Sequence, residues 1–229
     1  MNNAKTAITA KRKLSKRGRE TEERFLNAAN EVFWEIGFAG SKIVQIVTAG
    51  NLSVGSFYHL FADKSELLER ASERLLADFH TMSEGLDLSR SANADVFTLL
   101  YRLSYSSRVL IRRHRGIYRA TAELAQNDFS RYGAIQTIAP TMVKLMMQVM
   151  PEYDDQLDGG ASLRETSNAV QLIAMAGLQT ELGMGPLFPQ DVDGYAKTIA
   201  RAACGVLRYT GQIEGPSMAI TGVRYDDGF

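Results

Sequence analysis

The chain has 229 residues, of which 45% are hydrophobic, so it is long enough for one large or two modest globular domains. It has no run of about 18 apolar residues and no apolar stretch behind its basic N-terminus, which excludes a membrane span and a secretory signal. Its one cysteine, Cys204, excludes an internal disulfide framework and fits a reducing cytoplasm.

The net charge of zero conceals an uneven distribution, with +4 in residues 1–64 and −4 in the remainder. The first nineteen residues hold no acidic group and seven basic ones: Lys5, Lys11, Arg12, Lys13, Lys16, Arg17 and Arg19. Such a block is typical of a disordered arm that phosphate attracts, and we assign residues 1–18 to it. A merely solubilising tail is the alternative interpretation.

Apolar residues recur at helical spacing nearly everywhere, which predicts an all-α protein. A first helix is expected from Arg19, ending at Gly37 in a left-handed cap. A second, short helix is expected from about Lys42 to Ala49, with Ser41 as its N-cap.

Gly50 and Asn51, which both tolerate positive φ, separate that helix from the next one. Ser53 is expected to cap a third helix that runs to about Leu60. Asp63 and Glu66 form a capping-box pattern for a fourth helix that continues into the eighties. These helices define a small module at residues 19–79, followed by a linker at 85–93.

The second half predicts a larger helical domain at residues 80–211. Helices are expected at 94–114, from the break at Gly116 to about 126, at 129–150 with a kink at Pro140, at 163–182 and at 192–209. The tail at residues 212–229 has little periodicity and is expected to be loose.

Residues 42–61 have the spacing of a helix-turn-helix, whose second helix can enter a DNA major groove. A helix of seven or eight residues is roughly 11–12 Å long, comparable to a groove width of about 12 Å. Val54 and Ser56 lie in its first turn, where base edges are met, and Gly55 permits a close approach.

Hydroxyl, imidazole and ammonium groups around this helix are expected to contact phosphates, and so are the free N–H groups that begin the preceding helix. Helical core packing is the alternative for Phe57 and Tyr58, although it does not explain Gly55, His59 and Lys64 together. The expected DNA-binding residues are Ser41, Lys42, Ser53, Val54, Gly55, Ser56, Tyr58, His59 and Lys64.

This stretch resembles the DNA-binding domain of the tetracycline-repressor (TetR) family. The matching positions are Ser41, Ile46, Ser53, Gly55, Phe57, Tyr58, His59, Phe61 and Lys64, together with the upstream residues Phe33–Phe38. The motifs cover about residues 19–79 and are specific in combination. Asn51 stands where the family usually has glycine, and Val54 where lysine is frequent, which leaves the operator sequence open.

The resemblance implies an Ω-shaped homodimer in which the last two helices pair with their mates as a four-helix bundle. Apolar and small residues on these helices fit such pairing, and ordinary packing within one chain is the alternative. The expected interface residues are Leu172, Ile173, Ala176, Tyr195, Ile199, Ala202 and Val206.

The middle helices combine aromatic and polar groups, as a small-molecule pocket requires. The expected lining residues are Tyr101, Tyr105, Arg108, Tyr118 and Glu123. A methionine stripe at 142, 146, 147 and 150 fits plain core better than pocket.

The sequence shows no catalytic constellation, because His59, His80 and His114 lie apart and lack metal-ligand spacing. We therefore expect no enzyme, metal or cofactor. The expected function is a cytoplasmic, nucleoid-associated regulator: a repressor that binds a palindromic operator as a dimer and is released by a small-molecule inducer. The alternatives are a ligand-independent activator or architectural protein, and a ligand-binding dimer without operator affinity.

Overall fold

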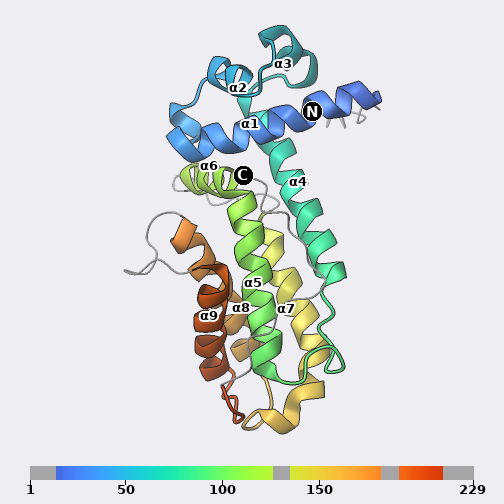
Figure 1. The fold of residues 1–229 in the computed structure, drawn as a ribbon, viewed down its shortest axis with the longest axis vertical. Helices are drawn as coiled ribbons and strands as arrows, with labels where there is room; N and C mark the ends of the chain where they lie inside the picture. The colour runs from blue at the N-terminus through green and yellow to red at the C-terminus, as the bar shows by residue number, and fades with distance from the viewer. Residues whose placement is uncertain (1–13, 126–134, 182–190, 214–229) are drawn as a thin grey trace, which may run out of the picture.

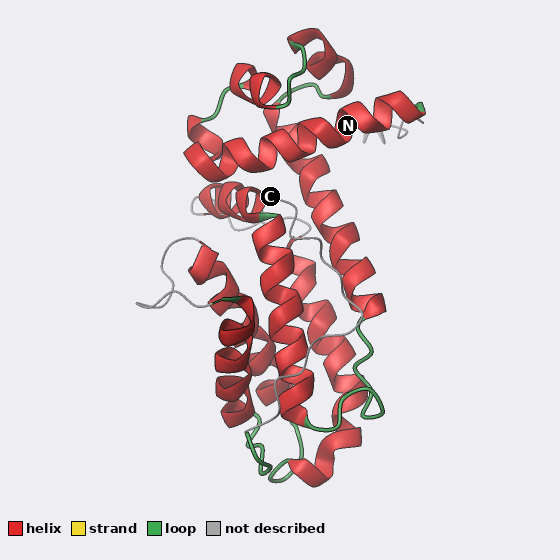
Figure 2. Ribbon diagram, viewed as in Figure 1, coloured by secondary structure: helices red, strands yellow, loops and turns green. Residues whose placement is uncertain are grey.

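The computed structural model describes residues 14–125, 135–181 and 191–213, where the regular secondary structure is helical apart from an isolated bridge between Leu157 and Tyr209 (Figure 2). The α-helices are α1 (Lys16–Gly40), α2 (Ile43–Ala49), α3 (Val54–Leu60), α4 (Lys64–Gly85), α5 (Val96–Arg113), α6 (Arg115–Ala125), α7 (Ile138–Val149), α8 (Leu163–Glu181) and α9 (Val192–Val206). A 3₁₀ helix, η2, covers Met150–Gln156. The all-α prediction is confirmed, and none of the described helices is long and apolar enough to cross a bilayer.

The helices form a small head and a long body (Figure 1). In the head, α2 and α3 lie on one side of α1, and α4 runs from there along the body. The helices α5, α7, α8 and α9 run along the length of the body. Helix α6 lies crosswise between these helices and α1, so the head packs on it.

Helix α1 begins earlier than the sequence predicted. Ser15 is its N-cap and accepts a hydrogen bond from the Gly18 amide at 3.2 Å, so Lys16 and Arg17 are helical although residues 1–18 were expected to be disordered. Residues 1–13 of that arm lie outside the described residues. Gly37 interrupts the helix at φ 76° and ψ 172°. The positive φ favours glycine, but the ψ is extended and the helix resumes as far as Gly40, so the left-handed cap that was expected to end the helix is not formed.

Helix α4 connects the head to the body. Asp63 caps it by accepting the Ser65 and Glu66 amides at 2.7 and 3.0 Å, while the Glu66 carboxylate accepts the Ala62 amide at 2.7 Å. The helix continues for 22 residues to Gly85, well beyond the predicted domain boundary at residue 79. Its first half packs in the head and its second half reaches the body, so α4 belongs to both.

Two other expectations about helix ends differ from the structure. Helix α7 begins at Ile138, so Pro140 lies in its first turn, where an amide has no helical partner to lose, and the predicted kink is wrong. The predicted start of this helix at residue 129 lies outside the described residues, as does residue 214 onward of the tail. Gly116 was predicted as a break and instead lies in the first turn of α6, against α1.

Candidate nucleic-acid interface and ligand cavity

The turn between α2 and α3 is built from three local features. Asn51 adopts φ 48°, as its residue type allowed, and the Leu52 amide donates to the Val47 carbonyl at 2.8 Å. Ser53 then caps α3, its hydroxyl accepting the Ser56 amide at 3.1 Å. These bonds fix where α3 starts and which way it points.

Three phenylalanines hold α3 against α1. The Phe25 ring meets Phe57 and Phe61 edge-on, with centroids 5.6 and 5.7 Å apart, and all three side chains are buried. Because Phe57 faces this core, the residues on the opposite side of α3 face outward.

The outward side of α3 carries the residues expected to meet DNA. Tyr58 is 59% exposed and Val54 is 44% exposed, although both are large and neither is charged. Gly55 and His59 are exposed as well, and Ser56 is half-buried with its hydroxyl 2.8 Å from that of Ser53. The outward face of α3 therefore presents Val54, Tyr58 and His59 to solvent.

At the start of α2, the structure changes the expected role of Ser41 and leaves Lys42 available. Ser41 is buried and its hydroxyl donates to the Phe38 carbonyl at 2.8 Å, so it is the C-cap of α1 and does not cap α2. Lys42 is instead the N-cap residue of α2, where its amide donates to the Gln45 side chain at 2.7 Å. The Lys42 side chain is exposed and free to meet a ligand's charge.

Lys64 is half-buried and directed into its own protein. Its ammonium donates to the carbonyls of Phe38 and, at 2.7 Å, Ser41, and it lies 4.3 Å from the centroid of the Phe38 ring. Burial lowers the pKa of this amine. In place of the expected phosphate contact, Lys64 ties the start of α4 to the segment between α1 and α2.

Arg24 positions the turn before α3, a contact that the sequence did not predict. Its guanidinium donates to the carbonyls of Gly50 and Asn51 at 2.7 and 2.8 Å, so α1 holds the turn that precedes α3. Its position one residue before the buried Phe25 gave no sign of a partner 26 residues away.

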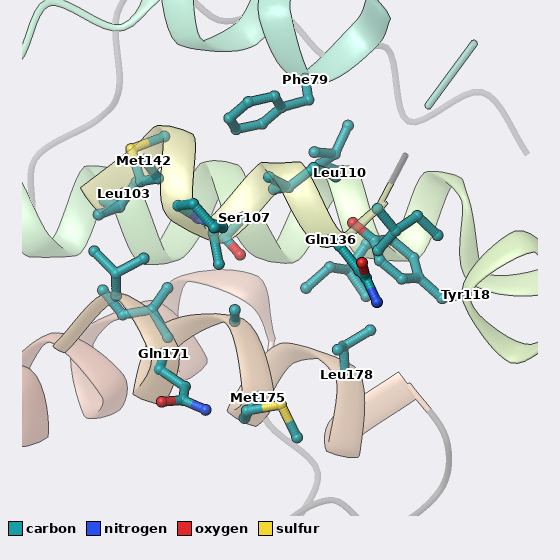
Figure 3. Close-up of a pocket in the computed structure, with 18 of the residues that line it drawn as sticks. Phe79, Leu103, Ser107, Leu110, Tyr118, Gln136, Met142, Gln171, Met175 and Leu178 are labelled. Carbon is teal, nitrogen blue, oxygen red and sulfur yellow. The ribbon is translucent and has the colours of Figure 1, made fainter. Parts of the chain in front are cut away.

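The body encloses a cavity of about 680 Å³ between α4, α5, α6, α7 and α8 (Figure 3). Helix α4 contributes Phe79 and Met82 to its wall. The other lining residues are Leu103, Ser107, Leu110, Ile111, Tyr118, Ile135, Gln136, Ile138, Ala139, Pro140, Met142, Val170, Gln171, Ile173, Ala174, Met175 and Leu178. Of the expected pocket residues only Tyr118 is among them; of the methionine stripe, Met142 lines the cavity and Met146 is core.

The other four expected pocket residues lie elsewhere. Tyr101 donates to the Asp193 carboxylate at 2.6 Å, and Tyr105 lies beside it with ring centroids 6.3 Å apart. Arg108 pairs with Glu181 and does not line the cavity. These three residues project from a face of α5 other than the one carrying Leu103, Ser107 and Leu110. From that face Tyr101 reaches α9 at Asp193, and Arg108 reaches α8 at Glu181.

Glu123 binds the head. Its Oε2 accepts the amides of Phe38 and Ala39 at 2.8 and 3.1 Å, so the last turns of α6 hold the end of α1 beyond its break at Gly37. An added Cβ on Gly37 would overlap this carboxylate, so glycine is needed there for the approach as well as for its φ. Glu123 is therefore a link between head and body rather than a pocket residue.

The expected dimer residues divide into two groups. Ile173 and Tyr195 are 2% and 4% exposed and pack inside their own chain, so they are unavailable to a second copy. Ala202 is exposed, and the rest are partly exposed along α8 and α9: Leu172, Ala176, Ile199 and Val206.

Among the described residues, no group of three His, Cys, Asp or Glu is placed to hold a metal ion. Cys204 is fully buried, and burial raises the pKa of its thiol to about 12. An inert core thiol was expected, since the nucleophilic form of cysteine is the thiolate.

Comparisons with known proteins agree with this arrangement. Residues 25–71 match the family model of the bacterial regulatory proteins, tetR family. Over 70 residues the chain is 37% identical to the HTH-type transcriptional regulator UidR of Escherichia coli K12, a match covering 29% of this chain and 36% of UidR. The chain thus spans about a third of the length of the curated relatives it matches.

Solved structures resemble the chain over most of its length. A regulatory protein of the tetR family from Rhodococcus RHA1 has a TM-score of 0.64 at 16% identity, covering 86% of this chain and 99% of its own. The ketosteroid transcriptional regulator KstR2 of Mycobacterium tuberculosis has a TM-score of 0.58 at 16% identity, covering 86% of this chain and 97% of its own. Reduced NemR of Escherichia coli has the same score at 17% identity, covering 81% of this chain and 96% of its own. At these identities the likeness shows a common fold.

Proposed function

We propose that this chain is a DNA-binding transcriptional regulator of the tetR family, and that it acts as a dimeric repressor released from its operator by a small molecule. The proposal has three parts: how α3 recognises DNA, how two copies assemble, and how a ligand bound in the body changes the conformation of the head.

The exposed face of α3 carries the first part. A seven-residue helix is about 10 Å long, which fits a major groove about 12 Å wide. Val54 and Ser56 lie in its first turn and face base edges, where a valine can touch a thymine methyl. An added Cβ on Gly55 would meet no atom closer than the Ser53 hydroxyl at 3.9 Å, so the space at this position is open for a duplex.

Phosphate contacts on either side would hold α3 in register. Tyr58 and His59 project from its outer face, and Lys42 precedes α2 with its side chain in solvent. Such groups fix the position of a reading helix without recognising sequence. The departures at Ser41 and Lys64 reduce the expected set of contacts but leave this core of it intact.

Assembly as a dimer would use the outer faces of α8 and α9. With Ile173 and Tyr195 committed to the chain's own core, the remaining candidates are Leu172, Ala176, Ile199, Ala202 and Val206. An added Cβ on Gly205 would meet no other atom within 4 Å, so a second helix could approach there closely. A dimer would then present two α3 helices about 34 Å, or one helical turn of DNA, apart.

The cavity supports a ligand-responsive regulator over a ligand-independent one. Its wall includes Phe79 and Met82 from α4, and α4 begins in the head. A molecule that displaces these side chains would therefore shift α4 and, with it, α3. DNA is released if the ligand binds the displaced arrangement more tightly than the DNA-binding one.

The test begins with a duplex selected from a random-sequence library by the wild-type chain. Fluorescence anisotropy should show that Tyr58→Phe weakens all duplexes alike, by about fivefold for one lost hydrogen bond. Val54→Ala should instead change the preferred sequence. Tyr209→Phe, in the body, is the control. If neither α3 variant differs from the wild type, α3 does not enter the groove.

A further inference from the structure

The described wall of the cavity is mainly apolar and uncharged. Among its described lining residues there is no aspartate, glutamate, lysine, arginine or histidine. The polar side chains that reach it are neutral: Ser107, Tyr118, Gln136 and Gln171 (Figure 3). An ionised group moved from water into such a space loses its hydration and gains no opposite charge from the described lining residues, which costs several kcal/mol.

One ion pair, Arg108–Glu181, adjoins the cavity wall along the chain. Arg108, next to the lining residue Ser107, forms an ion pair with Glu181, and these side chains are 12% and 9% exposed. The guanidinium also stacks 5.4 Å from the centroid of the Tyr195 ring. This pair lies outside the cavity wall, so it does not offer a free charge to a bound molecule.

Exposure changes along the wall. Phe79, Met142 and Ile173 are 1%, 4% and 2% exposed and form the deep part. Gln171 is exposed and Met175 is 46% exposed, so the open side of the cavity lies along α8. A molecule entering from there would bury an apolar portion first and leave its polar end near a neutral amide.

We propose that this cavity selects an electrically neutral, mainly apolar molecule with a hydroxyl, carbonyl or amide group at one end, and rejects ionised molecules of the same shape. A volume of about 680 Å³ is within the range of sites for drug-sized ligands. This inference rests on the proposed function only in naming the cavity as the regulator's ligand site.

Two fluorescent probes that share a ring system test the charge rule on the full chain. N-phenyl-1-naphthylamine is neutral, and 8-anilino-1-naphthalenesulfonate is its anionic analogue. We expect the neutral probe to bind at least tenfold more tightly. Equal affinities, tighter binding of the sulfonate, or no binding of the neutral probe would each overturn the proposal.

Two substitutions and one control locate the binding and test its cause. Ala174→Trp should fill the cavity and lower neutral-probe affinity at least tenfold, whereas Ala77→Trp, on the exposed side of α4, should not change it. Gln171→Lys adds a positive charge at the exposed side, where folding is not at risk. It should strengthen binding of the sulfonate severalfold and change neutral-probe binding less than twofold. An unchanged ratio of the two affinities would contradict the charge rule.

Duplex binding, measured on the same preparations without probe, separates the two proposals. Probe selectivity without duplex binding would contradict the proposed function and leave the ligand class standing. Duplex binding without probe selectivity would do the reverse.

Discussion

The backbone of Asn30 occupies the space that a side chain on Gly116 would need: an added Cβ would lie 2.7 Å from the Asn30 carbonyl carbon and closer still to its oxygen. The same pair is joined by a hydrogen bond of 3.1 Å from the Gly116 amide to the Asn30 side chain. At this contact, helix α6 can therefore approach α1 only through a residue that has no Cβ.

Gly116→Ala should destabilise the chain by about 1–3 kcal/mol, because the obstacle is backbone and cannot swing aside. Alanine is the better helix former by about 1 kcal/mol, so a net loss would identify the clash as its cause. Urea unfolding at one protein concentration measures the difference. Gly85→Ala is the matched control, since an added Cβ there meets nothing within 4 Å and should be neutral or stabilising.

The pair of buried His114 and half-buried Asp78 should make stability depend on pH. His114 is fully buried, with Nε2 2.8 Å from the Asp78 carboxylate and Nδ1 without a partner among the described residues. Burial lowers the pKa of the imidazole below 6.5 in spite of Asp78, and Arg74 and Arg113 lower it further. His114 is therefore neutral in the fold under conditions where the unfolded chain already binds the proton.

As pH falls below about 6.5, the unfolded state takes up a proton that the native state refuses, so stability falls, by at most about 1.4 kcal/mol per pH unit. The lowered pKa of Asp78 acts in the same direction but only near and below its usual 3.8. His114→Gln should flatten the dependence between pH 7 and 5.5, as followed by urea unfolding. His80→Gln, at an exposed position on α4, should not. Equal slopes in the wild type and His114→Gln would contradict this assignment.

Glu123→Gln tests the link between α6 and the head. The charged carboxylate accepts two amides, those of Phe38 and Ala39, and a neutral amide oxygen accepts them less strongly. The side chain is 29% exposed, so the expected loss of stability is modest, about 1 kcal/mol. Duplex affinity should fall as well, because the segment leading into α2 is less firmly held. Glu35→Gln, an exposed carboxylate on α1, should change neither quantity.

Lys42 and Lys64 should behave oppositely when each is changed to glutamine. Lys42→Gln should reduce the slope of log affinity against log salt by about one, because one phosphate contact is lost, and leave stability unchanged. Lys64→Gln should lower stability by about 1–2 kcal/mol, because two carbonyls lose a charged donor, and leave the salt slope unchanged. A reduced slope for Lys64→Gln would restore it as a phosphate contact.

The helices themselves could be predicted because their signals are local. The 3.6-residue period placed Phe57 inward and Tyr58 outward, the cap at Ser53 fixed where α3 starts, and Gly37 marked the break in α1. Each of these features depends on residues within one or two turns of the chain.

The partners of charged side chains could not be predicted, because they are distant in sequence. Glu123 meets Phe38 at a separation of 85 residues, and Lys64 meets the same residue at 26. The prediction of the pocket residues was wrong for a related reason. Helix α5 is packed on several sides. Its periodicity does not indicate whether the cavity lies on the side of Tyr101 and Arg108 or on the side of Leu103 and Ser107.

The burial of Cys204 means that an introduced surface cysteine can be labelled without labelling the native one. Cys204 is the one cysteine in the sequence, and burial keeps its thiol in the protonated, unreactive form. It should therefore not react with maleimides while the chain is folded. A cysteine introduced on the outer side of α3 would then take up a spin label alone. In a dimer, the distance between the two labels would measure the separation of the two α3 helices.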